Sequence, residues 1–261
     1  MREFNKIYLE DCISFMKQID AESIDLIIAD PPYNLNKNFG NNSDHWKDVK
    51  SWFEWSKEWI DKCIYILKPT GSIFVYGIHR YLCFIQCHLY EKNLKYRRQI
   101  IWYYENGFSC YKTLNAFYEP ILWFTKTNDF TYHEIREPYK SQDRLKNKIT
   151  KNGKVWNPNP KGRLMGDVWR FPTLAGKRFA TEKTNHPTQK PLALCNRLVK
   201  HFSNEGDLIF VPFAGSGSEC LSCLENKRNF LATEINPKYI EIANERLVEM
   251  RQQIKLKECR I

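Results

Sequence analysis

The chain has 261 residues, of which 43% are hydrophobic, and a formal net charge of +10 at pH 7. These values indicate a globular protein with one large core, or one core and a small appended lobe. The first residues lack the apolar stretch of a signal peptide, and no later stretch is long enough to span a bilayer, so we expect a cytoplasmic protein that does not enter a membrane.

Runs of β-branched and aromatic residues predict seven strands, several of them solidly apolar, as strands buried on both faces are. In chain order they are Lys6–Leu9, Asp25–Ala29, Ser72–Tyr76, Gln99–Trp102, Ile121–Phe124, Leu208–Val211 and Asn229–Thr233. Helical patterns cover Trp52–Ile66, Pro191–Phe202, Glu219–Asn226 and Pro237–Gln253. This alternation predicts an α/β fold, with a mostly parallel seven-stranded sheet and helices on both faces. Ligands of such folds bind beyond the carboxyl ends of the strands.

The positive charge is concentrated in one segment. Residues 136–178 hold twelve Lys or Arg and three acidic residues, which accounts for +9 of the +10. Such a segment is typical of a polyanion-binding surface, although a solvated loop is the ordinary alternative. Large aromatic residues such as Trp156 and Trp169 are interleaved with the charges, and they favour an ordered lobe over a tail.

Two strand ends suggest a cofactor that contains a nucleoside. The strand ending at Val211 leads into a Gly215-Ser216-Gly217 turn, where a ligand can approach the backbone closely. Glu234 follows Gly215 by 19 residues and ends the next strand, where an acid can reach ribose hydroxyls. The third glycine of the dinucleotide fingerprint is replaced by Cys220, so we expect a cofactor without a pyrophosphate.

A third strand end carries the tetrapeptide Asp30-Pro31-Pro32-Tyr33. An exocyclic amino group on a base is a poor nucleophile because its lone pair is delocalised into the ring. Two acceptors, the Asp30 carboxylate and the Pro31 carbonyl, would favour a tetrahedral nitrogen, and the two prolines would preorganise them. Tyr33 offers a face for stacking a base. The alternative is a strand-ending turn with an incidental Asp.

These motifs resemble those of the S-adenosylmethionine-dependent amino-methyltransferases of DNA. Asp30–Tyr33 resembles their catalytic motif, Phe213–Gly217 their cofactor motif, and His186–Pro191 the segment before the cofactor strand. Their order along the chain is similar to that of the β group, and residues 134–171 look like the recognition lobe of the MboII-type adenine-N6 enzymes.

The resemblance implies a circularly permuted Rossmann-like sheet with Lys6–Leu9 as an inner strand. It also implies a catalytic half at 1–130, a target-recognition lobe at 131–185 and a cofactor-binding half at 186–261. The implied catalytic residues are Asp30, Pro31, Pro32 and Tyr33. Those implied for S-adenosyl-L-methionine are Asp11 at the adenine end, Glu234 at the ribose, His186, Thr188 and Lys190 near the methionine carboxylate, and Asp30, Phe213, Gly215, Ser216, Gly217 and Ser218.

The resemblance further implies a site-specific DNA adenine-N6 methyltransferase of a type II restriction–modification system, which flips its target base at a GAAGA-like site. The expected contacts to double-stranded DNA are Asn34, Lys151, Lys154, Lys161, Arg163, Arg170, Lys177 and Arg178. A companion methylase, a restriction endonuclease and a homodimer fit such a system. Three alternatives stay open, namely N4-cytosine methylation, a DNA-binding module with a degenerate cofactor site, and RNA methylation.

Two residues and one segment qualify the resemblance. Val211 stands where most similar proteins have Asp, which removes a partner for the cofactor's ammonium or for amides of the turn. Tyr104 stands where similar proteins often have Lys. We expect residues 34–44, directly after the catalytic motif, to form a lid that orders when DNA binds.

The cysteines predict reduced thiols and no metal site. There are nine, an odd number, scattered through apolar contexts. Cys220 and Cys223 form a CxxC pair, but no second pair or nearby His completes a zinc site, and the spacing also fits one face of a helix.

Overall fold

A parallel sheet with a single reversed internal strand organises the molecule. The computed structural model describes residues 2–35, 37, 44–106, 112 and 114–259. The first half contains β1 (Lys6–Leu9), α1 (Cys12–Met16), β2 (Ile24–Ala29), α2 (Val49–Ile66), β3 (Leu67–Tyr76), α3 (Leu82–Glu91), β4 (Lys95–Tyr103) and β5 (Tyr118–Thr125). The last part contains α4 (Leu192–Phe202), β11 (Leu208–Val211), α5 (Ser218–Glu225), β12 (Asn229–Glu234) and α6 (Pro237–Glu258).

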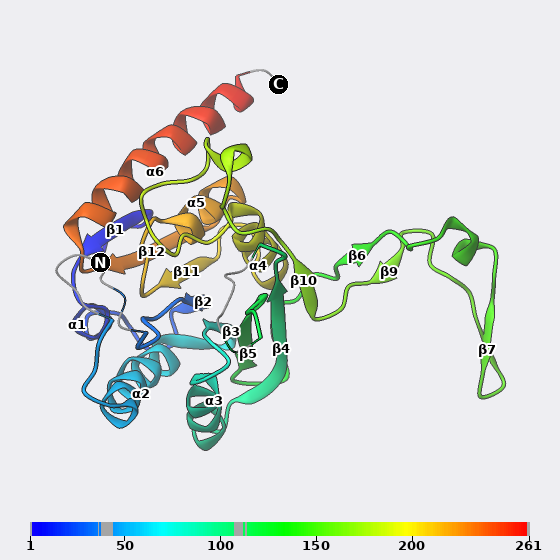
Figure 1. Cartoon of the computed structure of the whole chain (residues 1–261), viewed down its shortest axis with the longest axis horizontal. Helices are drawn as coiled ribbons and strands as arrows, with labels where there is room; N and C mark the ends of the chain where they lie inside the picture. The colour runs from blue at the N-terminus through cyan, green and yellow to red at the C-terminus, as the bar shows by residue number, and fades with distance from the viewer. Residues whose placement is uncertain (1, 36, 38–43, 107–111, 113, 260–261) are drawn as a thin grey trace.

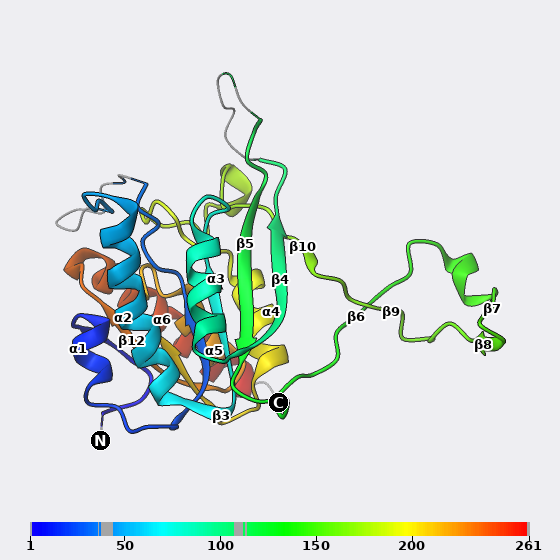
Figure 2. The same cartoon turned by 90° about the horizontal axis from the view of Figure 1, so that it is seen from below.

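Between them lies the basic segment, with β6 (Arg136–Glu137), the 3-10 turn η1 (Gln142–Leu145), β7 (Ile149–Lys151), β8 (Lys154–Trp156), β9 (Arg163–Leu164), β10 (Val168–Arg170) and the 3-10 turn η2 (Lys177–Phe179). The pairs β6–β9 and β7–β8 form two separate antiparallel ribbons. Figures 1 and 2 show them as an arm that projects away from the sheet.

The main sheet has eight strands in the order β1-β12-β11-β2-β3-β5-β4-β10. Among the strands that the structure describes, only β5 runs antiparallel to its neighbours in this sheet, β3 and β4. All seven predicted strands are present, and the predicted fold class is confirmed. The eighth strand, β10, comes from the segment that we assigned to the lobe and pairs in parallel with β4. Its three residues are too few for a pattern of alternation to be recognised in the sequence.

The prediction that Lys6–Leu9 is an inner strand was wrong, because β1 is at the edge and pairs only with β12 among the described strands. The burial pattern explains this position. Of its four residues only Ile7 is buried, whereas β2, between β11 and β3, has five buried residues out of six. An inner strand of a sheet that is covered on both faces is buried along most of its length, and the exposed residues of β1 do not fit such a position.

Two layers of helices cover the sheet, as predicted. On one face α1, α2 and α3 pack around residues such as Trp59, Ile60 and Leu89. On the other face α4, α5 and α6 pack through residues such as Leu198 and Leu247. Figure 1 shows the two helix layers on opposite sides of the strands. The helices α1 and α3 were not predicted, since short apolar runs cannot be assigned to helix or strand from periodicity alone. No helix in the described part of the chain combines the length and apolarity needed to cross a membrane.

Candidate active site

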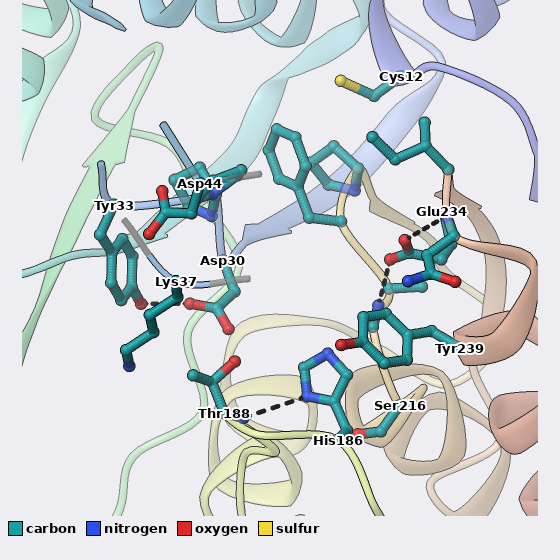
Figure 3. A pocket seen from close by; sticks show the side chains of 18 of the residues that line it. Cys12, Asp30, Tyr33, Lys37, Asp44, His186, Thr188, Ser216, Glu234 and Tyr239 are labelled. Carbon is teal, nitrogen blue, oxygen red and sulfur yellow. Dashed lines mark hydrogen bonds between the residues drawn. The ribbon is translucent and has the colours of Figure 1, made fainter. Parts of the chain in front are cut away.

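A cavity of about 360 Å³ opens at the carboxyl ends of β1, β2, β11 and β12, as expected for a parallel sheet. It brings together three segments that are distant in sequence, namely the catalytic tetrapeptide, the glycine turn and the loop before α4. Of the predicted residues, the cavity is lined by Asp11, Asp30, Pro31, Pro32, Tyr33, His186, Thr188, Lys190, Phe213, Gly215, Ser216 and Glu234. Figure 3 shows Asp30 and Tyr33 on one side of it and Glu234 and Tyr239 on the other.

The tetrapeptide is held rigidly between β2 and α2. The indole nitrogen of Trp52, a buried residue of α2, donates a 2.9 Å hydrogen bond to the carbonyl oxygen of Pro32. The Tyr33 hydroxyl donates to Oδ1 of Asp30. Burial, and then the adjacent Asp30 carboxylate, raise the pKa of Tyr33 well above its ordinary value, so the phenol stays protonated and can act as a donor. The ring and the carboxylate are therefore oriented by each other.

Lys190 is the main partner of Asp30. It is 4% exposed, and its ammonium nitrogen lies 2.7 Å from Oδ2 of Asp30 and 3.4 Å from Oε2 of Glu119 on β5. Burial lowers the pKa of Lys190, but the two carboxylates outweigh that effect and hold it above its ordinary value. Lys190 is thus charged and balances the negative charge of the Asp30 carboxylate. The role implied by the resemblance, near the methionine carboxylate, stays a prediction.

The glycine turn has the geometry that the sequence suggested. Gly215 has a φ of +49°, and a Cβ at this position would lie 2.8 Å from the His186 imidazole. The Gly215 amide donates a 2.8 Å hydrogen bond to Oε2 of Glu234. Glu234 therefore accepts from a backbone amide of the glycine turn. This is one of the two roles that a carboxylate at position 211 would have, the other being a partner for the cofactor's ammonium. The Val211 side chain is buried in the core.

Two of the predicted cofactor residues, Gly217 and Ser218, do not line the cavity. Gly217, with a φ of +76°, precedes α5, and a Cβ there would lie 2.9 Å from Cβ of Ala243 on α6. Ser218 is buried, and its hydroxyl accepts a 3.2 Å hydrogen bond from Arg246. Both residues therefore support the turn from outside the cavity. Gly217 allows α5 and α6 to pack closely, and Ser218 binds Arg246 of α6.

His186 lies against the turn as a neutral ring. Burial lowers its pKa to about 4, and its Nδ1 accepts a 3.4 Å hydrogen bond from the Thr188 amide. Its ring also contacts Tyr239 edge-on, with 4.4 Å between centroids. Of these two residues of the cavity wall, Lys190 and not His186 therefore carries a positive charge at neutral pH.

Several lining residues were missed by the sequence analysis. They are Glu10, Cys12, Lys37, Asp44, Trp46, Trp55, Gln189, Pro212, Ala214, Glu219, Ile235, Asn236 and Tyr239. Trp55 lies within the predicted helix Trp52–Ile66, and it packs against Phe213 with 5.8 Å between centroids. Asp44 is buried and accepts a 2.9 Å hydrogen bond from the Leu35 amide. Most of the expected lid, residues 36 and 38–43, lies outside the described residues.

The predicted DNA contacts lie mainly on the arm and beside it. Lys151 and Lys154 face each other across the β7–β8 ribbon. Lys161, Lys177 and Arg178 are exposed. Two further arginines are already paired with acids, Arg163 with Glu137 at 3.0 Å and Arg170 with Glu105 at 2.6 Å. Asn34 stands apart from the arm, next to the catalytic turn, and its side-chain oxygen accepts a 3.1 Å hydrogen bond from the Trp46 amide.

The two residues of the CxxC pair are buried on α5 within the core. Cys223 is one residue of a hydrophobic cluster that also contains Leu198 and Leu247. No cluster of metal-ligating side chains occurs among the residues that the structure describes. The helical interpretation of this spacing is confirmed.

A mainly parallel α/β sheet in which a glycine turn, the carboxylate of Glu234 and the Asp30–Tyr33 turn surround one cavity has the arrangement expected of a methyltransferase that binds a nucleoside cofactor. Residues 24–245 match the model of the N6/N4 DNA methylase family. The chain belongs to this family, and the predicted resemblance is confirmed.

The relatives include the type II methyltransferase M1.MboII of Moraxella bovis, which is 35% identical over 94% of this chain and 96% of its own. The DNA adenine methyltransferase YhdJ of Escherichia coli (strain K12) is 34% identical over 91% of this chain and 80% of its own. Among solved structures, the M1.HpyAVI complex with SAM aligns with a TM-score of 0.62 at 22% identity, over 93% of this chain and 98% of the other, and shows the same fold.

These comparisons support DNA methylation, with S-adenosyl-L-methionine as the cofactor, in a restriction–modification setting. The residues present fit that cofactor. The backbone at Gly215 leaves room for a close approach, because a Cβ would project toward His186. Each oxygen of Glu234 accepts one backbone amide, from Gly215 and from Asn236, and keeps a lone pair for ribose hydroxyls. Trp55 and Phe213 provide aromatic faces for a planar base.

Proposed function

We propose that the chain is a site-specific DNA adenine-N6 methyltransferase of a type II restriction–modification system. The observation that carries this proposal is that the Asp30–Tyr33 turn and the Gly215 turn line one cavity. A single transfer between a target base and a bound cofactor can therefore connect them. The adenine assignment draws on the aspartate of the catalytic motif and on the adenine enzyme among the relatives.

The transfer would proceed with the target adenine flipped out of the duplex and stacked on Tyr33. Bound S-adenosyl-L-methionine supplies an electrophilic methyl group on a sulfonium. The Asp30 carboxylate and the Pro31 carbonyl accept the two N6–H bonds, which directs the N6 lone pair at the methyl carbon. Methyl transfer would form the N–C bond at the expense of the C–S bond, whose electron pair would stay on sulfur. Asp30 would stabilise the charge that develops on nitrogen, and the extra proton of N6 would then pass to water.

The free lone pairs of Asp30 allow this arrangement. Oδ1 accepts one hydrogen bond from Tyr33 and Oδ2 accepts one from Lys190. A carboxylate offers about four acceptor sites, so each oxygen can accept a second donor. Lys190 balances the charge of the Asp30 carboxylate without occupying all of its acceptor sites, so a base amino group can bind to either oxygen.

The arm is the proposed site of DNA recognition. Its ribbons extend beyond the sheet on the side of β4 and β10 and carry exposed lysines (Figures 1 and 2). Lys151, Lys154, Lys161, Lys177 and Arg178 would bind phosphates and make binding salt-dependent. Arg163 and Arg170 would have to exchange their acidic partners for phosphates. We keep the domain division, the GAAGA-like site, a homodimer, a companion methylase, an endonuclease and a cytoplasmic location as parts of this proposal.

The test is methylation of unmodified duplex DNA with the purified protein, followed by mass analysis of the nucleosides and single-molecule sequencing of the product. N6-methyladenine within one short asymmetric sequence is the expected result. N4-methylcytosine would replace the adenine assignment with its main rival, since the matched family includes both kinds of enzyme. An Asp30→Ala variant should incorporate no methyl groups yet bind the cofactor, and full activity of this variant would refute the assigned mechanism.

The two remaining alternatives have simple discriminating tests. Val211 is the observation behind a DNA-binding module with a degenerate cofactor site, and failure to bind S-adenosyl-L-methionine at millimolar concentration would support that function. Competition between DNA and RNA oligonucleotides in the methylation assay tests RNA methylation. We expect DNA to be the preferred competitor, because the family is one of DNA methylases.

A further inference from the structure

Glu219 is a buried acid in the wall of the cofactor cavity that the transfer described above does not use. It is in the first turn of α5, two residues after Gly217, and only 4% of it is exposed. It nevertheless lines the cavity together with Asp30, Lys190 and Ser216. A carboxylate in such a position is destabilising unless a donor or a cation faces it. Its surroundings therefore indicate what it binds.

Within the part of the protein that the structure describes, Glu219 has two hydrogen-bond donors, its own backbone amide and a thiol, and neither carries a full positive charge. Oε1 of Glu219 accepts a hydrogen bond from the Cys195 thiol of α4, with a sulfur–oxygen distance of 3.5 Å. Thiols are poor donors. No basic side chain among the described residues forms an ion pair with Glu219, because Lys190 pairs with Asp30 and Glu119. Arg246 of α6 instead donates to the Ser216 carbonyl oxygen at 2.5 Å and to the Ser218 hydroxyl.

The charged and titratable groups around Glu219 come from every element packed against it. Asp30 follows β2, Lys190 precedes α4, Tyr76 ends β3, Cys195 is on α4 and Arg246 is on α6. Burial, followed by the negative charge of Asp30, raises the pKa of Glu219 to about 7, and Lys190 opposes this only in part. Lys190 and Arg246 lie near Glu219, but no described basic side chain forms an ion pair with it, and a cationic ligand would supply that partner.

We propose that Glu219 accepts a hydrogen bond from the α-ammonium group of bound S-adenosyl-L-methionine. This inference rests on the cofactor of the proposed function. The cofactor has two cationic centres, and they differ in chemistry. The ammonium has three N–H donors that need acceptors when water is excluded, whereas the sulfonium has no donor at all. A carboxylate whose hydrogen-bond partners in the protein are an amide and a thiol can still accept a hydrogen bond from the ammonium. Glu219 also provides an acid just after the glycine turn, whereas Val211, just before that turn, provides none.

A consequence is that cofactor binding releases protons near neutral pH. In the free protein at pH 7, about half of the Glu219 side chains carry a proton. The ammonium favours the ionised form, so its arrival drives that proton off. His186, which faces the same cavity with a pKa of about 4, is already neutral and contributes no proton at this pH.

The test is titration calorimetry of the full chain with S-adenosyl-L-methionine at pH 7 in two buffers of different ionisation enthalpy. The wild type is expected to release a fraction of a proton for each cofactor bound. Glu219→Gln should release none by this route and should bind roughly tenfold more weakly, because the amide oxygen can still accept a hydrogen bond but no longer carries a negative charge. Glu225→Gln is the matched control. It removes a charge from the same helix, where Glu225 accepts a hydrogen bond from Asn196 outside the cavity, and should bind and release protons like the wild type.

S-adenosylhomocysteine separates the two cationic centres, since it keeps the ammonium and lacks the sulfonium. Glu219→Gln should weaken both ligands by the same factor. A loss seen with S-adenosyl-L-methionine alone would assign Glu219 to the sulfonium and overturn the proposal. Unchanged affinity and proton release in a folded Glu219→Gln variant would also overturn it.

If Glu219→Gln does not fold, Glu219→Asp decides. It keeps the charge with one methylene fewer, and the proposal expects proton release to persist while affinity falls. Proton release lost in Glu219→Asp would count against the inference. These measurements use neither DNA nor turnover, so they stay valid if the chain proves to methylate a base other than adenine.

Discussion

The buried ion pair between Asp30 and Lys190 is expected to contribute measurably to the stability of the fold. The change is Asp30→Asn, which removes the charge and keeps the shape and one acceptor. Lys190 is 4% exposed and the side chain of Asp30 is 17% exposed, with 2.7 Å between their charged atoms. Lys190 would then be left in the core with only Glu119, 3.4 Å away.

The magnitude follows from these distances. Two unit charges 2.7 Å apart attract by about 6 kcal/mol at an effective dielectric constant of about 20. Much of this attraction offsets the desolvation of the two ions, and removing one member of a buried pair typically costs about 3–5 kcal/mol. Glu119 keeps part of the compensation for Lys190. We therefore expect Asp30→Asn to lower the free energy of unfolding by about 3 kcal/mol.

The assay is a double-mutant cycle with Lys190→Met, which has a similar volume and no charge. Lys190→Met alone leaves the Asp30 and Glu119 carboxylates together without a cation and should lower the free energy of unfolding by about as much. Denaturant unfolding with unchanged m-values gives each free energy. The double variant should lose at least about 2 kcal/mol less than the sum of the two single losses. Losses that add to within about 0.5 kcal/mol would refute the pairing.

Two further predictions concern the cofactor pocket. Gly215→Ala places a methyl group 2.8 Å from the His186 ring at a φ of +49°. It should weaken binding of S-adenosyl-L-methionine at least about tenfold while the protein still folds, which a titration and a circular dichroism spectrum test together. The second prediction concerns Glu219, whose pKa in the folded protein is raised from 4.5 to about 7, so that its contribution to stability is fully present below pH 4.5 and is lost as the pH rises through 7. Without cofactor, the free energy of unfolding of the wild type should therefore fall by about 3 kcal/mol relative to Glu219→Gln between about pH 4.5 and about pH 8, and parallel pH profiles of the two proteins would contradict this.

The parts of the site that were predicted are those in which one short segment carries the signal. Asp30–Tyr33 and Gly215–Gly217 each combine restrictive backbone residues with a strand end, and local sequence determines both features. The cavity then brought these two segments together, as the rule for parallel sheets requires. Glu234 was predicted for the same reason, since its distance from Gly215 along the chain reflects one helix and one strand.

Other residues could not be predicted because their roles depend on partners that are far away in sequence. The sequence did not show that Lys190 pairs with Asp30 and Glu119, because these carboxylates follow β2 and lie on β5. Trp52 was predicted only as part of a helix, but its indole nitrogen also fixes the Pro32 carbonyl. Glu219 looked like an ordinary helix residue, and only the packing of α4 and α6 shows that it is buried.

The sequence by itself determined the class of fold, the order of the functional segments and the chemistry of the catalytic and glycine turns. Hydrophobic periodicity and special backbone residues are local properties, and they act over a few residues. The tertiary structure alone decided that β1 is at the edge, that β10 extends the sheet, and which charges are buried together. Strand order and ion pairing depend on contacts between distant segments, and the strength of each pair depends on how much water the surrounding fold excludes.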